Sequence, residues 1–210
     1  MNPFDFVLST GLAVWRRFGG RCRRWWYGKS FSLSAKRIGS DISISPDNTF
    51  DVPVRSDGTG SINIGAKNVF GYAQTVRLGT GEILIQPRTP TSKIVIGQGN
   101  WFSNNVAIVA TQEVVIGNGC QIGDMVTIYD TDFHEINPKT RNRSAGNASP
   151  VSIGDNVWLG SRVMILKGVT IGDNSVVGPM SVVSKSIPAN SLAVGAPACV
   201  IRQIGENDSE

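Results

Sequence analysis

The chain has 210 residues, a hydrophobic content of 40% and a charged content of 17%, which suits a folded domain and excludes a disordered one. Its formal net charge of +4 is unevenly distributed, because residues 1–40 contain eight Lys or Arg against one acid and so carry +7, which leaves −3 for the rest. This distribution excludes a nucleic-acid groove along the main domain. Three separated cysteines, Cys22, Cys120 and Cys199, exclude a disulfide framework and indicate a reducing, cytoplasmic compartment.

Residues 1–40 form a basic, tryptophan-rich segment. In "GLAVWRRFGGRCRRWWYGK", Leu12, Trp15, Cys22 and Trp25 recur at roughly helical spacing with five arginines between them. The pattern is typical of an interfacial helix on anionic lipid, and a helix packed on the protein or on a neighbouring subunit is the alternative. The order of charges opposes a secretory signal, and the apolar run is too short to span a bilayer. We therefore expect peripheral membrane contact through residues 12–27, at the inner face.

A six-residue repeat organises residues 41–204, although no pattern is visible before Ile62. Apolar residues recur at sixes in three upstream groups: Ile64, Phe70 and Val76; Ile96, Phe102 and Ile108; and, after two inserted residues, Ile116, Ile122 and Ile128. Six more follow without a gap: Ile153, Leu159, Ile165, Ile171, Val177 and Val183. A period of six predicts short strands broken by identical turns, three to a triangular coil, with these side chains pointing inward. The coils would stack at about 4.8 Å.

A polar stretch of 24 residues, 129–152, interrupts this repeat and contains His134, the only histidine of the chain. It is too long and too polar to form part of a coil, so we expect it to leave the domain as an extended arm. Long loops on regular scaffolds are usually functional. From the loop alone, an exposed histidine without a role is the alternative.

The repeat, together with the ending "PVSIGDNVWLGSRVMILKGVTIGDNSVVGPMSVVSKSIPANSLAVGAPACVIRQI", resembles the hexapeptide-repeat acyltransferases over about residues 94–204. Within them it is similar to the sugar O-acetyltransferase branch, which includes the maltose and galactoside acetyltransferases. The resemblance implies an all-β, left-handed parallel β-helix, to which the residue patterns above add the extruded loop and a short N-terminal segment that can be helical. It also implies a homotrimer that moves an acetyl group from acetyl-CoA to a saccharide hydroxyl, for example on a polysaccharide or glycan precursor, without a metal.

The resemblance places His134, in "DFHEINPKTRNRSAG", at the position of the catalytic histidine. An imidazole can take up a proton near neutral pH, which suits a general base that deprotonates the sugar hydroxyl. Asn104, in "NWFSNNVAIV", resembles the asparagine that contacts the acceptor sugar. An asparagine that only closes a corner turn is the alternative.

The resemblance also implies a coenzyme channel. Trp158 and Ser161, in "WLGS", lie where the family lines that channel, and Ser184 and Lys185 match its Thr-Lys pair beside the pantetheine. Arg202, in "ACVIRQI", resembles an arginine that meets the nucleotide phosphates. The Trp158 indole could equally pack between subunits.

Two positions of the channel depart from the family. Pro179 stands where a small alanine is common, and Cys199 replaces a basic residue. Both predict a weaker or differently arranged contact with the nucleotide. Cys199 is expected to be a small buried filler and not a nucleophile.

Other functions of the same repeat are an assembly scaffold without activity and an N-acetyltransferase for amino sugars. The carbonic anhydrases of this fold need three histidines at zinc, and one histidine excludes them. The extruded arm favours an enzyme, and its resemblance favours a hydroxyl acceptor. The acidic tail, residues 205–210, is expected to lie outside the domain.

Overall fold

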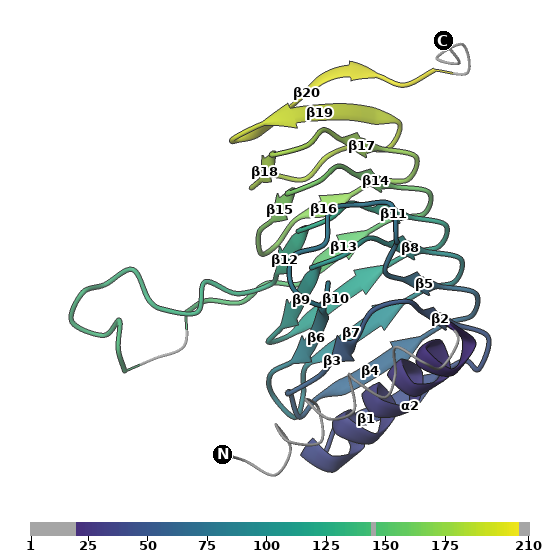
Figure 1. Ribbon diagram of the computed structural model, residues 1–210. Helices are drawn as coiled ribbons and strands as arrows, with labels where there is room; N and C mark the ends of the chain where they lie inside the picture. Colours follow the sequence, from purple (N-terminus) through teal and green to yellow (C-terminus); the bar gives the residue numbers. More distant parts are fainter. Residues whose placement is uncertain (1–19, 144–145, 206–210) are drawn as a thin grey trace.

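A computed structural model describes residues 20–143 and 146–205 (Figure 1). Short strands wind into a triangular prism with three flat faces, and one helix, α2 (Gly20–Ile38), lies across the end formed by the first coil. Leu12, Trp15 and most of the acidic tail lie outside the described residues. In the part of the chain that is described, no helix is long and apolar enough to cross a membrane.

Each of the six complete coils contributes one strand to each of three sheets, which we name A, B and C in chain order, and two further strands at the C-terminal end extend sheet B, the last of them antiparallel. Sheet A contains β1 (Asp41–Ile44), β4 (Ser61–Ile64), β7 (Lys93–Ile96), β10 (Glu113–Ile116), β13 (Val151–Ile153) and β16 (Thr170–Ile171). Sheet B contains β2 (Thr49–Phe50), β5 (Val69–Phe70), β8 (Trp101–Phe102), β11 (Gln121–Ile122), β14 (Trp158–Leu159), β17 (Val176–Val177), β19 (Ser191–Gly195) and β20 (Ala198–Gln203). Sheet C contains β3 (Val54–Arg55), β6 (Ile83–Pro87), β9 (Ala107–Ala110), β12 (Thr127–Tyr129), β15 (Met164–Ile165) and β18 (Val182–Val183).

The six-residue repeat produces this prism because every sixth side chain points into the same narrow interior. Ile153 stacks on Ile171 in parallel register, and the Gly154 N–H donates to the Ile171 carbonyl at 2.8 Å. All twelve inward positions from Ile96 to Val183 are buried, as predicted. The fifth places are buried as well: Val157, Val163, Val169, Ser175, Ser181 and Ile187.

One inward prediction is wrong. Val76 is 53% exposed, because the chain leaves sheet B after Phe70 and forms a loop, residues 71–82, before β6. Ile83 and Ile85 take the inward positions of the next face. The loop is held outside by Asn105, whose amide exchanges two hydrogen bonds with the backbone of Leu78.

The irregular stretch before Ile62 forms the first coil, β1 to β3, and α2 closes it. Phe31 and Ala35 of the helix are buried against this coil. A column of aromatic rings continues this contact along the prism axis. The ring centroids of Phe31 and Phe50 are 6.2 Å apart. Phe70 is stacked between Phe50 and Phe102, with its ring centroid 5.0 Å from each of theirs. The helix therefore covers the apolar end that the coil stack would otherwise expose to water.

Candidate active site

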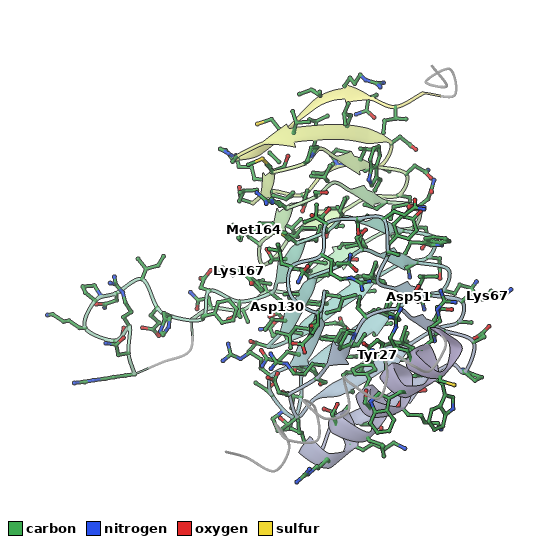
Figure 2. The ribbon with its side chains drawn as sticks, in the orientation of Figure 1. Tyr27, Asp51, Lys67, Asp130, Met164 and Lys167 are labelled. Carbon is green, nitrogen blue, oxygen red and sulfur yellow. The ribbon has the colours of Figure 1, made fainter. Side chains whose placement is uncertain are left out.

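The arm leaves the prism after β12 and returns at β13, at the corner between sheets C and A (Figure 1). Its two strands are held together at the root, where Thr131 forms an antiparallel bridge with Ala148. The Asp132 N–H donates to the Asn147 carbonyl at 3.0 Å, and Lys167 Nζ lies 2.8 Å from Asp132 Oδ2. Figure 2 shows Asp130 and Lys167 at this root. The arm is therefore fixed where it leaves the body.

Asp130 joins the root to the two inserted residues of the preceding coil. Its buried carboxylate accepts the N–H of Thr111 at 2.7 Å and the N–H of Gln112 at 2.6 Å. Burial raises the pKa of Asp130, and these N–H groups offset part of the rise. The insertion thus supplies the two donors that hold the first residue of the arm's root.

The structure places His134 on the arm with its side chain exposed and Nδ1 3.1 Å from the Arg141 carbonyl. A carbonyl oxygen only accepts hydrogen bonds, so this contact requires the proton on Nδ1. In the neutral imidazole with this tautomer, Nε2 is the nitrogen with a free lone pair, which is the form that a general base needs.

The backbone before His134 and the returning strand of the arm opposite it are both constrained. Phe133 has φ +64°, a left-handed conformation that is costly for a bulky side chain. Its ring packs edge-on against Tyr129 at 5.1 Å, and the Arg88 guanidinium lies 5.2 Å from the ring centroid. Gly146 fits against His134 only because it lacks a side chain, since a Cβ there would lie 2.5 Å from the His134 carbonyl oxygen. Phe133 therefore anchors the arm to the prism one residue before His134.

A groove of about 340 Å³ lies on the outer surface of sheet B, away from the arm. Trp101, Gln121 and Trp158 are in register on three successive strands, so the glutamine lies between two indoles, of which Trp158 is 56% exposed. Tyr72 meets Trp101 edge-on at 6.2 Å and forms a wall. The lining residues are Tyr72, Thr75, Trp101, Phe102, Ser103, Gln121, Ile122, Gly123 and Trp158.

Asn104 is buried and supports the wall of this groove. Its amide nitrogen donates to the Tyr72 carbonyl at 2.8 Å and to Thr75 Oγ1 at 3.0 Å, and its Oδ1 accepts the Tyr72 N–H at 3.1 Å. The geometry matches the interpretation as a corner asparagine. Because the loop occupies both ends of the amide, a contact between Asn104 and the acceptor stays a prediction without direct support.

Two of the predicted coenzyme positions, Ser161 and Pro179, follow the corner between sheets B and C upward from the groove, and a third, Arg202, lies on the face of sheet B. Ser161 Oγ donates to the buried Asp124 Oδ1 at 2.6 Å, and the exposed Pro179 lies one coil above. Arg202 lies on β20, opposite Leu192 of β19, at the end of the sheet B column that contains Trp158 and Val176. Along the prism axis, the rise from Asn104 to Arg202 is five strand spacings, or about 24 Å.

Ser184 and Lys185 lie on a different edge. Both are exposed between β18 and Ile187, which is the corner between sheets C and A where the arm leaves two coils below. In a triangular prism this corner is opposite the face formed by sheet B. A single chain therefore brings His134, Ser184 and Lys185 to the corner between sheets C and A, which we name the arm edge. It brings Asn104, Trp158, Ser161, Pro179 and Arg202 to the face of sheet B and its corner with sheet C, which together we name the sheet B edge.

Several features of the site were missed by the sequence reasoning. Trp101 occupies an outward place of the repeat, and an exposed tryptophan at such a place was a usable signal. Nothing in the sequence marks Phe133 or Gly146, because their importance depends on a backbone angle and a close approach. Cys199 is exposed, so its interpretation as a buried filler is wrong: β20 lies on the rim of sheet B, outside the prism interior. Among the described residues, no group of three or more His, Cys, Asp or Glu side chains could hold a metal ion.

The chain is similar to several known proteins. A family model described as bacterial transferase hexapeptide (six repeats) matches residues 150–185. Galactoside O-acetyltransferase from Escherichia coli (strain K12) is 43% identical over 117 residues, which cover 56% of this chain and 57% of the relative. The matched segments span 54–60% of the length of the first curated relatives.

Two solved structures match this chain over a larger share of their own length. A maltose O-acetyltransferase from Clostridium difficile 630 is 32% identical with a TM-score of 0.50, over 81% of this chain and 73% of that one. A galactoside acetyltransferase in complex with coenzyme A is 30% identical with a TM-score of 0.54, over 84% of this chain and 70% of that one. These neighbours confirm the left-handed parallel β-helix, and the chain belongs to the hexapeptide-repeat acyltransferase family.

Proposed function

We propose that this protein transfers an acetyl group from acetyl-CoA to a hydroxyl group of a saccharide, with His134 as general base. The observation that carries the proposal is the exposed His134 imidazole, whose Nδ1 contact leaves Nε2 to accept a proton. The similarity to galactoside and maltose O-acetyltransferases supports the acetyl donor and the sugar acceptor.

The chemistry needs no covalent intermediate on the protein, because a thioester is already activated. The acceptor oxygen attacks the carbonyl carbon of the acetyl group as its proton passes to His134 Nε2. The carbon–sulfur bond then breaks, and the proton returns from His134 to the departing thiolate of the coenzyme. The products are the sugar acetate ester and free coenzyme A, and the histidine ends in its starting state.

We propose further that the working unit is a homotrimer with each site between two copies. Rotation about a threefold axis parallel to the prism preserves height, so the arm edge of one copy can face the sheet B edge of the next. The groups that would share one site lie at similar heights on the two edges. The arm that carries His134 leaves the prism at the fourth coil, which is also the height of Gln121, with Trp158 one coil above. Lys185 lies two coils above the arm, toward the end of the prism that carries Arg202.

In this arrangement the coenzyme lies along the edge between copies. Lys185 and Arg202 meet its phosphates through charge-assisted contacts, and Trp158 and Ser161 line the path toward the thioester. The groove beside Trp101 and Trp158 offers flat aromatic surface and one amide, which suits a pyranose ring with an apolar face and hydroxyls at its rim.

The activity is tested with radiolabelled acetyl-CoA and a panel of saccharides, with acetyl-CoA binding measured by calorimetry. We expect acetyl-CoA to bind and at least one saccharide to become an alkali-labile acetate ester. Failure to bind acetyl-CoA favours a scaffold, and an alkali-stable amide product favours N-acetylation.

Mixed trimers test the shared site. His134→Ala damages the arm edge and Trp158→Ala damages the sheet B edge, so refolding the two variants together at equal amounts restores about one quarter of the interfaces. Activity near a quarter of the wild-type value is expected. As a matched control, His134→Ala mixed with Lys185→Ala places both changes on the arm edge, so no intact interface can form. Both mixtures are assayed at acetyl-CoA well below the wild-type Michaelis constant, where a copy with Lys185→Ala contributes little activity. Equal behaviour of the two mixtures contradicts a site shared between copies.

A further inference from the structure

The outward face of α2 carries large apolar side chains among cations. Trp25 is 62% exposed and Leu33 is 63% exposed, and Lys29 and Lys36 are exposed beside them. The four residues follow the spacing i, i+4, i+8 and i+11, so they lie along one side of the helix. Phe31, on the opposite side, is buried in the first coil. Packing on the prism therefore accounts for the inner face of α2 and leaves this outer face to be explained.

Charge is concentrated at the same end of the molecule. The 19 residues of α2 contain six Lys or Arg and no Asp or Glu, whereas residues 41–210 carry a net charge of −3. Because α2 lies across the end of the prism, the positive charge is presented end-on (Figure 1). Such a charge distribution orients the molecule with α2 toward an anionic surface.

We propose that the outward face of α2 binds the surface of an anionic phospholipid bilayer. Trp25 and Leu33 enter the interfacial region, where an indole is accommodated with its apolar body in contact with acyl chains and its N–H in the headgroup layer. Lys29 and Lys36 extend their alkyl stems along the interface and place their ammonium groups against lipid phosphates.

Lipid is favoured over RNA, which also attracts cations and aromatic rings. An RNA site uses rings that stack on bases, and it gains nothing from a leucine as exposed as Leu33. An interfacial helix uses every apolar side chain of its face.

The proposed trimer would strengthen this contact. Cyclic symmetry places the three α2 helices at the same end of the assembly, so one particle presents three such faces to one membrane. This gain in affinity from three α2 faces on one particle rests on the trimer proposed above. A single copy binds through the same residues with lower affinity, so a monomeric protein that binds vesicles would contradict the trimer and support the membrane face.

The test is sedimentation of the full chain with vesicles of phosphatidylcholine alone or with 30 mol% phosphatidylglycerol. We expect binding only to the anionic vesicles and a loss of binding at high salt. Each cation at such a surface contributes about fivefold in affinity, so Lys29→Glu/Lys36→Glu should weaken binding at least 25-fold, and Trp25→Ser/Leu33→Ser should weaken it at unchanged charge. Arg162→Glu, an exposed change on the fifth coil, is the matched control and should bind nearly as wild type.

Three outcomes would overturn the proposal. Equal binding to neutral and anionic vesicles rejects the electrostatic contact. Wild-type binding by both α2 double variants assigns the membrane contact to another segment. Tight binding of an RNA oligonucleotide without binding of anionic vesicles assigns the face to nucleic acid. Circular dichroism of each variant checks that the exposed substitutions leave the fold intact.

Discussion

The stacked coils and the arm differ in how many contacts hold them in place. In the coils, each inward side chain lies between two equivalents and each strand is bonded to the coil above and below, as Ile153 is to Ile116 and Ile171. The arm spans 24 residues, and its described part contacts the prism through its root and the Phe133 ring. Stability is therefore distributed over the coils, whereas the proposed chemistry depends on a few contacts. Substitutions should separate the two properties.

The largest effect is expected for His134→Ala. Loss of a general base typically costs about 10²–10⁴ in turnover, and the melting temperature should not change because the side chain is exposed. Acetyl-CoA binding, measured by calorimetry, should also be unchanged, since the imidazole acts on the acceptor. Wild-type turnover of this variant at saturating acceptor would remove His134 from the mechanism.

Phe70→Ala should show the reverse pattern. Phe70 is fully buried between Phe50 and Phe102, so its truncation leaves a cavity and lowers the free energy of unfolding by about 3–5 kcal/mol. Val76→Ala, six residues along the chain and exposed, should change it by less than about 0.5 kcal/mol. Urea denaturation of both variants measures the difference, and equal losses would restore Val76 to the core.

Lys185→Ala and Arg202→Ala test the two edges of the coenzyme path. A charge-assisted contact to phosphate is worth about 1.5–3 kcal/mol, so each change should raise the Michaelis constant for acetyl-CoA by about 10–100-fold with a smaller effect on turnover. Initial rates over a range of acetyl-CoA concentrations separate the two quantities. If the Michaelis constant for acetyl-CoA is unchanged in both variants, the phosphates of the coenzyme bind elsewhere.

Phe133→Ala should affect turnover through the position of His134. Without the ring, the arm loses its contacts with Tyr129 and Arg88, and we expect turnover to fall about tenfold while acetyl-CoA binding is retained. Phe133→Tyr keeps the ring and should recover most of the turnover. Ile136→Ala, at an exposed position of the arm, is the control and should behave as wild type. A similar loss in all three variants would point to a general disturbance of the arm.

The smallest effect concerns Asp130 and pH. Burial raises the pKa of this carboxyl in the folded protein, so its contribution to stability is present below the ordinary carboxyl pKa and is lost as pH rises through the folded pKa. Asp130→Asn cannot titrate, and the difference in unfolding free energy between variant and wild type should therefore shift in favour of the variant as pH rises over that interval. Urea denaturation at several acidic pH values measures the difference. A difference that is constant with pH contradicts the shift.

The coils could be predicted residue by residue, whereas the site could be predicted only as a set of positions. Ile153, Leu159 and their equivalents are buried where the period of six placed them, because each side chain repeats the environment of the one before. Val76 is the exception. It fits the six-residue period in the sequence, although the chain has already left the coil at that point. Before Ile62 the pattern is hidden, because a terminal coil packs against α2 and not against a second coil.

The sequence by itself determined the β-helix, the position of the arm and the lone imidazole on it, because periodicity and residue type are local properties. Only the tertiary structure decided that His134 and Trp158 lie on different edges of one chain, since the distribution of residues over corners and faces depends on how coils of unequal length close. It also decided that Phe133 adopts a left-handed backbone, because the contacts that support this conformation, Tyr129 and Arg88, come from two neighbouring segments of the prism.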